Sequence, residues 1–208
     1  MDFELPADDD PRRLALQSWL AENPEPGGRQ LAEAGYVVPH WPAPWGLDAD
    51  PIHQLVIDEE LRAARVRRPN NPIGIGWAGP TILHAGTEDQ KVAYLPGLLS
   101  GEEMWCQLFS EPGAGSDLAN LGTSAVRDGD EWVVNGQKIW TSLAQFSTYG
   151  ILIARTASDV PRHAGITYFV CPMDTPGIDP AHHRNDRRPY LQRGVLHRCP
   201  ASGQFGGG

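Results

Sequence analysis

Residues 105–117 read Trp-Cys-Gln-Leu-Phe-Ser-Glu-Pro-Gly-Ala-Gly-Ser-Asp, and just before them the hydrophobic pattern changes from helical to strand-like. The apolar start is typical of a strand, and the small residues after it form a loop whose backbone N–H groups a ligand can approach closely. With hydroxyls at Ser110 and Ser116, such a loop suits a phosphate or the polar edge of a ring. Gly113 and Gly115 lack the third glycine of a dinucleotide fingerprint, and a Gly-Lys-Ser/Thr phosphate loop is absent. On these residues alone, an ordinary glycine-rich turn is the simpler interpretation.

A second segment, Asn-Gly-Gln-Lys-Ile-Trp-Thr-Ser at residues 135–142, brings an indole and two hydroxyls together. Asn135-Gly136 predicts a tight turn, because both residues tolerate positive φ. A strand expected over Lys138–Thr141 then places Trp140 and Ser142 on one side, since side chains alternate with a period of two. An indole beside a hydroxyl can pack against a planar ring and donate a hydrogen bond to its edge. A tryptophan that only fills the core is the competing interpretation, and the residues alone favour it.

Short runs of β type surround both segments and predict a β domain from residue 103 to residue 179. Alternating runs cover residues 123–126 and 131–134, and longer β-rich runs cover residues 150–155 and 166–171. Asp128-Gly129-Asp130 separates the first two runs as a strong hairpin signal. Hairpins at this spacing predict an antiparallel barrel or sandwich.

The first 102 residues are predicted to be helical. Apolar residues at helical spacing begin near Pro11, and the longest helix is expected over Pro51–Arg68. Thr87–Gln90 forms a capping box for another helix that reaches about residue 95. The chain therefore combines a helical part with a β part.

The composition of the chain argues against several classes of protein, namely nucleic-acid-binding, membrane-spanning and secreted disulfide-rich proteins. The chain has 208 residues, of which 40% are hydrophobic, and a net charge of −9, which argues against nucleic acid and anionic membranes as its main partners. No run approaches the roughly 18–20 apolar residues of a membrane span. The acidic start Met1–Glu4 does not fit a secretory signal. The three cysteines are widely spaced and form neither a disulfide framework nor a metal clip, so a cytoplasmic protein is expected.

Together the two segments resemble the flavin motifs of the acyl-CoA dehydrogenases. Trp105–Asp117 is similar to the family's flavin loop, in which an apolar strand leads into Thr/Ser-Glu-Pro and then Gly-Ser-Asp. Asn135–Ser142 is similar to its second motif, Asn-Gly-x-Lys-x-Trp-x-Ser/Thr, and the interval between the motifs also matches. The similarity covers roughly residues 30–179.

The resemblance implies an α+β multidomain flavoprotein. Its helical N-terminal domain would span residues 1–102, and an incomplete antiparallel β-barrel middle domain would span residues 103–179. The implied reaction is the FAD-dependent α,β-dehydrogenation of an acyl-CoA thioester, as in fatty acid metabolism. The implied partners are an electron-transfer flavoprotein-type acceptor and further subunits in a homo-oligomer or hetero-oligomer. By position, the residues implied to bind FAD are Gln107, Leu108, Phe109, Ser110, Glu111, Gly113, Gly115, Ser116, Trp140, Thr141 and Ser142.

Four of these residues receive individual roles from the resemblance. Ser110 would bond the pyrimidine edge of the flavin, and Ser116 would also meet the CoA portion of the substrate. Trp140 would pack beside the isoalloxazine. Ser142 would donate a hydrogen bond to its redox nitrogen, a position where the family more often has Thr.

No residue of this sequence is assigned as the catalytic base. The family's base is a Glu of a C-terminal helical bundle, and no position here matches it. Glu111 corresponds to a family carboxylate that is not the base, so a structural role in the loop is expected for it. Glu59 and Glu60 are expected to be ordinary surface charge on a helix. His182-His183 has no third ligand at a suitable spacing, so no metal site is predicted.

The family pattern stops after residue 179. Residues 180–208 place few large apolar residues among Arg, His, Pro and Gly, which argues against further barrel strands and predicts a disordered tail. Out-of-frame translation in a high-GC genome is one hypothesis for this tail. Without the remaining barrel strands and the bundle, the chain is expected to hold FAD weakly or not at all and to show no turnover.

Two alternatives to an acyl-CoA dehydrogenase remain open on the sequence. One is a flavin monooxygenase-type relative that uses the same scaffold for oxygen-dependent chemistry. The other is a non-catalytic remnant that binds partner subunits or nothing. The sequence leaves the acyl chain length, the electron acceptor and the oligomeric state undetermined.

Overall fold

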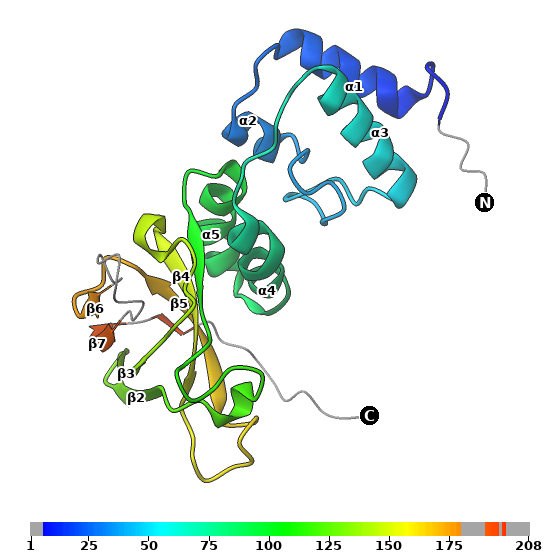
Figure 1. Cartoon of the computed structure of the whole chain (residues 1–208). Helices are drawn as coiled ribbons and strands as arrows, with labels where there is room; N and C mark the ends of the chain where they lie inside the picture. The colour runs from blue at the N-terminus through cyan, green and yellow to red at the C-terminus, as the bar shows by residue number, and fades with distance from the viewer. Residues whose placement is uncertain (1–5, 180–189, 196, 199–208) are drawn as a thin grey trace. The chain divides into compact units, whose positions relative to one another are not determined.

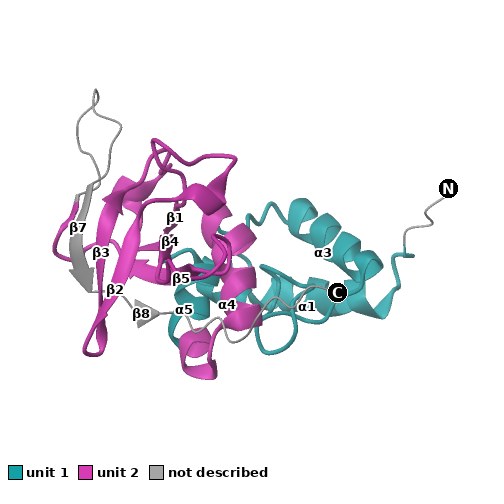
Figure 2. Cartoon of the chain, turned by 90° about the horizontal axis from the view of Figure 1, so that it is seen from below, with its two compact units in different colours: residues 1–71, 93–102 teal, residues 72–92, 103–208 magenta. Residues whose placement is uncertain are grey.

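The computed structural model describes residues 6–179, 190–195 and 197–198 (Figure 1). These residues divide into two compact units, shown separately coloured in Figure 2. Unit 1 comprises residues 1–71 and 93–102, and unit 2 comprises residues 72–92 and 103–208. Unit 1 is helical and unit 2 contains the sheet, so the predicted helical part followed by a β part is confirmed.

Unit 1 contains α1 (Pro11–Glu22), α2 (Gly28–Glu33), α3 (Pro51–Ala63) and the second part of α5 (Glu88–Ser100). Two of these helices begin at a proline that follows an aspartate. The Asp10 carboxylate accepts a hydrogen bond from the Arg12 amide at 2.9 Å, and Asp50 accepts one from the His53 amide at 2.7 Å. These caps satisfy amides that lack a helical partner, which is why the helices begin where the sequence predicts. The buried leucines of the unit are Leu16, Leu31, Leu61, Leu95, Leu98 and Leu99.

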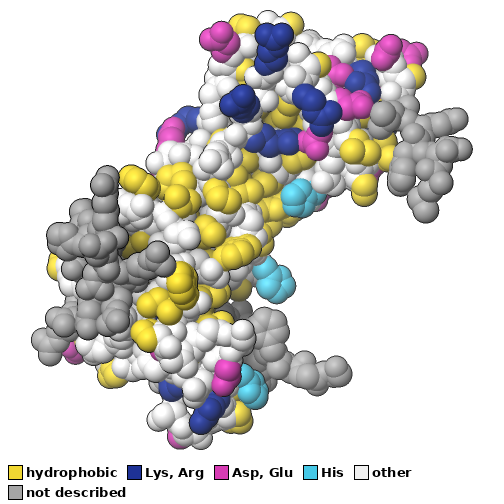
Figure 3. Space-filling view, in the orientation of Figure 1, with side chains coloured by type: hydrophobic (Ala, Val, Ile, Leu, Met, Phe, Trp, Pro, Cys, Tyr) yellow, Lys and Arg dark blue, Asp and Glu magenta, His cyan; other side chains and the backbone are white. Residues whose placement is uncertain are grey.

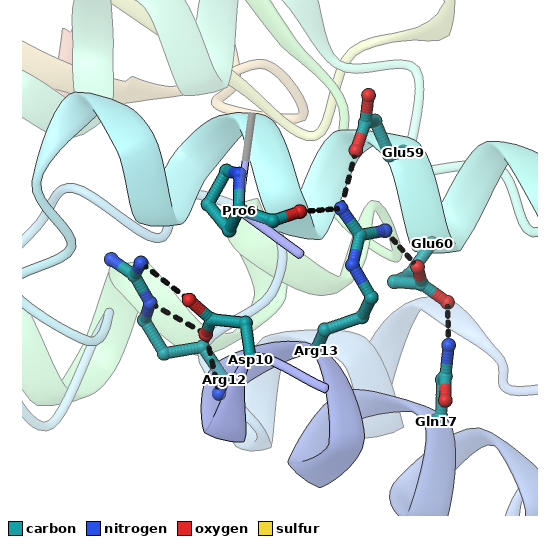
Figure 4. A network of polar contacts seen from close by, with 7 residues as sticks. All are labelled: Pro6, Asp10, Arg12, Arg13, Gln17, Glu59 and Glu60. Atoms are coloured by element: carbon teal, nitrogen blue, oxygen red, sulfur yellow. Dashed lines mark hydrogen bonds and ion pairs between the residues drawn. The ribbon is translucent and has the colours of Figure 1, made fainter. Parts of the chain in front are cut away.

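A buried polar cluster joins α1 to α3 (Figure 4). The Arg13 guanidinium, on α1, bonds both Glu60 and Glu59 of α3, the latter at 2.8 Å. Gln17 donates to the other Glu60 oxygen at 3.0 Å. Glu60 is only 8% exposed, so the expectation that it is ordinary surface charge is wrong. The carboxylates face the packed helix α1 because Arg13 provides them with a partner there.

Lys and Arg side chains lie interspersed with Asp and Glu side chains over unit 1 on the face shown in Figure 3. Three exposed arginines, Arg62, Arg65 and Arg67, lie at and just beyond the end of α3. Cations at a helix C-terminus complement the partial negative charge of its last carbonyls, which accounts for their position.

The helical part of unit 2 begins with one π-helical turn, η1 (Gly74–Ala78), which continues into α4 (Gly79–Ala85). α5 starts in this unit at the predicted capping box. The Thr87 amide donates to the Gln90 side chain at 3.0 Å, and the Gln90 amide donates to the Thr87 hydroxyl at 3.2 Å. The reciprocal pair satisfies two free amides at the helix start, as the sequence predicts.

Unit 2 is dominated by one curled sheet of eight strands in the order β6-β7-β3-β2-β4-β5-β8, with β1 pairing only with β4 among the described residues (Figure 1). β1 and β4 run parallel, and one parallel pair also links β2 to β4, so the sheet is mixed rather than strictly antiparallel. The strands are β1 (Trp105–Leu108), β2 (Ser124–Asp128), β3 (Glu131–Gln137), β4 (Tyr149–Arg155), β5 (Ile166–Pro172), β6 (Ile178–Asp179), β7 (Tyr190–Val195) and β8 (His197–Arg198).

Side chains of β4 supply both faces of the sheet. Leu152 and Ala154 belong to the larger apolar cluster, with residues of β1, β2, β3 and β5. Ile153 points to the opposite face, as the alternation of a strand requires, and packs in a smaller cluster with Ala114 and Leu121. The glycine-rich loop is therefore anchored on the second face of the sheet.

The turn predictions had mixed outcomes. Asp128-Gly129-Asp130 does connect β2 to β3, with Gly129 at a φ of +61°. Asn135-Gly136 is not a turn but part of β3. A Cβ on Gly136 would lie 2.2 Å from the Thr123 hydroxyl oxygen, so the glycine is needed for a close approach and not for a reversal.

The segment after residue 179 also differs from expectation. Two of its stretches form strands: β7 pairs with β3 and β6, and β8 pairs with β5. Backbone pairing satisfies the open edges of β3 and β5 without requiring an alternating apolar pattern, which explains why the pattern did not reveal these strands. The rest of the predicted disordered tail, including His182-His183, lies outside the described residues.

Candidate functional site

Main-chain and side-chain hydrogen bonds bring the two sequence segments into one site within unit 2. The Ile139 amide donates to the Ser110 carbonyl at 2.8 Å. The Lys138 ammonium donates to the Phe109 carbonyl at 3.1 Å. The end of β1 and the chain beyond β3 therefore lie side by side, although about 30 residues separate them in sequence. Convergence of the two segments is the arrangement on which the flavin interpretation depends.

Glu111 and Lys138 form a buried ion pair at the centre of this junction. The Glu111 carboxylate accepts hydrogen bonds from Lys138 at 2.7 Å, from the Gly122 amide at 2.6 Å and from the Thr123 amide at 3.0 Å. The Lys138 side chain is fully buried and that of Glu111 is 9% exposed. With these three donors the carboxylate organises the loop, which agrees with the structural role expected for it.

Burial and pairing act in opposite directions on the ionisation of this pair. Burial by itself raises the pKa of Glu111, but hydrogen bonds from Lys138, Thr123 and Gly122 outweigh it and hold the pKa below its ordinary value. Burial also lowers the pKa of Lys138, and the hydrogen bond to Glu111 limits that decrease. A carboxylate whose pKa is lowered is a weak proton acceptor, so Glu111 is poorly suited to act as a general base.

The glycine-rich loop beyond Glu111 presents an open backbone. It closes with two hydrogen bonds, from the Glu111 amide to the Ala114 carbonyl at 2.8 Å and in the reverse direction at 3.2 Å. A Cβ on Gly113 or Gly115 would meet nothing within 4 Å, and both glycines and Ser116 are exposed. The loop therefore leaves its backbone accessible to a ligand while Ala114 anchors it in the core.

Trp140 lies on a strained, exposed bend rather than on the predicted strand. β3 ends at Gln137, and Trp140 has a φ of +59°. A left-handed backbone costs about 1–2 kcal/mol for a residue other than glycine. The Trp140 side chain is 69% exposed, so it is not the core tryptophan that the residues alone favoured. The Ser142 amide donates to the Trp140 carbonyl at 3.0 Å, and Ser142 is exposed on the same bend.

The other residues predicted to bind the cofactor have mixed environments. Leu108 is buried in the core, so only its backbone can reach a ligand. Gln107, Phe109, Ser110 and Thr141 are half-buried. Within the described part of the chain, no hydrogen bond engages the hydroxyls of Ser110, Ser116 or Ser142. The structure thus joins Ser110 and Glu111 to the Lys138–Ser142 segment, and no hydrogen bond among the described residues links Ser116 to Ser142.

The arrangement fits a planar, polar-edged cofactor such as FAD. An exposed indole held in a strained conformation offers a face for stacking, and the free hydroxyls and glycine backbone offer hydrogen bonds to the edge of a ring or to a phosphate. Sequence reasoning missed Lys138 as the buried partner of Glu111. The sequence carries no local signal for this pair, because 27 residues separate Glu111 from Lys138.

Neither a membrane-spanning helix nor a three-ligand metal cluster occurs among the described residues. No helix among them is long and apolar enough to cross a membrane. No group of three or more His, Cys, Asp or Glu side chains in that part of the chain could hold a metal ion.

Comparison with known proteins connects this site to a family. The profile "Acyl-CoA dehydrogenase, N-terminal domain" matches residues 14–102, and "Acyl-CoA dehydrogenase, middle domain" matches residues 106–188. The chain is 55% identical to acyl-CoA dehydrogenase FadE34 of Mycobacterium tuberculosis over 149 residues, which are 72% of this chain and 21% of that protein.

Solved structures agree with the sequence matches. The chain resembles the Tcur3481-Tcur3483 steroid ACAD with a TM-score of 0.67 and 32% identity, over 97% of this chain and 58% of that one. It resembles the ChsE4-ChsE5 complex from Mycobacterium tuberculosis with a TM-score of 0.66 and 32% identity, over 97% of this chain and 57% of that one. The chain thus spans less than two thirds of the length of these relatives. By its two matching domains, its fold and its paired motifs, the chain belongs to the acyl-CoA dehydrogenase family.

Proposed function

We propose that the junction of Ser110–Ser116 with Trp140–Ser142 is part of the FAD site of an enzyme that oxidises the Cα–Cβ bond of acyl-CoA thioesters. The observation that carries the proposal is the pair of links between the two motifs, from Ile139 to Ser110 and from Lys138 to Glu111. These links hold an open glycine backbone and an exposed indole on one fixed framework. A rigid framework of this kind keeps a cofactor site organised before the ligand binds.

Each group of residues has a distinct part in this proposal. The segment from Gln107 to Ser116 would line the flavin, and the Ser110 hydroxyl would bond the pyrimidine edge. Trp140 would pack beside the ring, Thr141 would adjoin it, and the Ser142 hydroxyl would donate to the redox nitrogen. When bound, FAD supplies the acceptor for a hydride from the substrate. Ser116, exposed at the end of the loop, is also placed to meet the CoA portion.

The proposal also covers the carboxylate inside the first motif. Glu111 is occupied by Lys138 and two amides and is no candidate for the base. We therefore assign Glu111 to the organisation of the loop and not to proton transfer.

A titration with FAD tests the site directly. Flavin fluorescence is followed as the purified chain is added, and we expect a saturable signal that Trp140→Ala weakens several-fold. Trp77→Ala is the matched control, because Trp77 is also an exposed tryptophan of unit 2, at 50% exposure, but lies outside both motifs. Absence of saturable binding in the parent chain, or equal losses in the two variants, would contradict the proposal.

Acyl-CoA is the proposed substrate, and an electron-transfer flavoprotein-type acceptor and further subunits are the proposed partners. One of the similar structures is the ChsE4-ChsE5 complex, which makes a hetero-oligomer as reasonable as a homo-oligomer for this chain. Co-expression with full-length relatives followed by size-exclusion chromatography distinguishes the two. An acyl-CoA-dependent dye reduction assay, run beside an oxygen-consumption assay, separates dehydrogenation from monooxygenase chemistry.

A further inference from the structure

Arg155, the last residue of β4, makes an unusual set of hydrogen bonds. One end of its guanidinium donates to the Ala119 carbonyl at 2.7 Å and to the Leu121 carbonyl at 3.4 Å. The other end donates to the Arg162 carbonyl at 2.9 Å. All of these acceptors are main-chain oxygens, so Arg155 connects segments of backbone instead of balancing a carboxylate.

The first two carbonyls stand at the downstream end of the glycine-rich loop. The short helix η2 (Leu118–Asn120) follows directly on Asp117, and Ala119 and Leu121 belong to it or to its end. The upstream end of the loop is held by Glu111. The segment from Gly113 to Asp117, in which Ala114 is buried and the other residues are exposed, therefore runs from Glu111 to η2, and Arg155 holds the η2 end.

Glu111 and Arg155 both bond the backbone directly after Leu121, at residues 122–123. Glu111 accepts hydrogen bonds from the amides of Gly122 and Thr123, and the Arg155 amide donates to the Thr123 carbonyl at 2.8 Å. Leu121, next to them, is buried with Ala114. These contacts close the loop, and among the described residues Arg155 alone donates a side-chain hydrogen bond to the Ala119 and Leu121 carbonyls.

A second loop, residues 156–165, packs against the same guanidinium. The Thr156 amide donates to the Gly165 carbonyl at 2.9 Å, and a Cβ on Gly165 would lie 2.1 Å from the Ala157 carbonyl oxygen and 3.3 Å from an Arg155 nitrogen. From this loop the Arg162 guanidinium donates to the Asn120 side chain at 3.0 Å. The loop therefore crosses close to Arg155 and makes its own bond to η2.

We propose that Arg155 is a positioning residue for the cofactor site, which sets the placement of the Gly113–Asp117 backbone through its hydrogen bonds to the η2 carbonyls. The inference rests on the proposed function, because the loop is the proposed flavin contact. The guanidinium group is planar and its N–H donors point in fixed directions, so it can bond the η2 carbonyls and the 156–165 loop at the same time. A lysine has a single ammonium group, so it can keep either the hydrogen bonds to η2 or the one to the Arg162 carbonyl, but not both.

The test uses the full chain with three substitutions: Arg155→Met, Arg155→Lys and the control Arg127→Met. Arg127 is an exposed arginine of β2 whose guanidinium bonds the Gly129 carbonyl at 2.9 Å, within its own hairpin. Hydrogen exchange is measured for the amides of Asn120 and Leu121, which donate inside η2, and FAD affinity is measured by the fluorescence titration. Both are recorded at a temperature where circular dichroism shows all variants to be folded.

We expect Arg155→Met to accelerate exchange at these amides by about tenfold or more, to leave β5 amides unchanged and to weaken FAD binding several-fold. Arg155→Lys should recover part of both effects, and Arg127→Met should change neither. Unchanged η2 exchange in Arg155→Met, or an equal acceleration across the whole sheet, overturns the inference. If the parent chain binds no FAD while η2 exchange still responds to Arg155→Met, the proposed function fails and the role of Arg155 in placing the loop stands.

Discussion

Replacing Lys138 with methionine removes the charge that faces Glu111 and leaves the volume of the side chain almost unchanged. Removing one partner of a buried ion pair typically destabilises a protein by about 3–5 kcal/mol, because the other charge stays buried without compensation. Glu111 keeps its bonds from the Gly122 and Thr123 amides and retains slight exposure, so we expect the smaller loss of about 2–4 kcal/mol. The free energy of unfolding is measured by urea denaturation, with exchange of β4 amides as the measure for unit 2 alone.

Two further variants make this test specific. Glu111→Gln combined with Lys138→Met completes a double-mutant cycle, and the double variant should lose less than the sum of the single variants because neither charge is then left alone. Lys91→Met is the matched control, since Lys91 pairs with Glu88 at the surface of the same unit at 2.8 Å and should contribute less than about 1 kcal/mol. A loss for Lys138→Met no larger than that of the control would refute the argument that this pair holds the two motifs together.

Four other outcomes follow from the same structure. Gly136→Ala should destabilise unit 2 by about 1–3 kcal/mol in urea denaturation, because its Cβ would overlap Thr123, and an unchanged midpoint would contradict the close approach. Trp140→Gly should weaken FAD binding and leave the melting temperature equal or higher, because glycine adopts the left-handed backbone conformation of this position without strain. A lower melting temperature would show that Trp140 contributes to the core. The folded-state pKa of Glu111 lies below its ordinary value of 4.5. Its contribution to the free energy of unfolding is therefore complete above pH 4.5 and is lost as the pH falls through the folded-state pKa. The free energy of unfolding of the Lys138→Met variant should decrease less steeply as the pH falls over this range. Burial raises the pKa of Cys106 to about 11, so its labelling by a thiol reagent at pH 8 should require unfolding, and rapid labelling of the native chain would contradict its burial.

Local signals predicted the elements that depend on neighbours in the sequence. Pro11 and Pro51 begin helices because an aspartate directly before each of them caps the free amides. Thr87 and Gln90 start α5 through a reciprocal pair three residues apart. Gly129 makes the β2–β3 hairpin because a tight turn needs positive φ there. In each case the interacting groups lie within a few residues, so the sequence displays the whole interaction.

The errors arose where a distant partner decides the outcome. Gly136 resembles a turn residue, but it lies inside β3 because its backbone pairs with β7, and its missing side chain leaves room for Thr123. Glu60 resembles surface charge until α1 brings Arg13 against it. Trp140 was assigned to a strand, and the bend that exposes it begins where the neighbouring Ile139 bonds to Ser110. A hydrophobic pattern carries no information on such partners.

Sequence alone determined the membership of the chain in a family and the identity of its two motifs, because both consist of ordered residue types at fixed spacing. It also determined the helix starts and one hairpin, which arise from contacts within a single turn of chain. Only the tertiary structure decided that Lys138 is buried against Glu111, that β1 runs parallel to β4, and that Arg155 holds the far end of the loop. Those features depend on groups about 30 or more residues apart, whose meeting is set by the packing of the whole sheet and is not encoded in any short stretch of sequence.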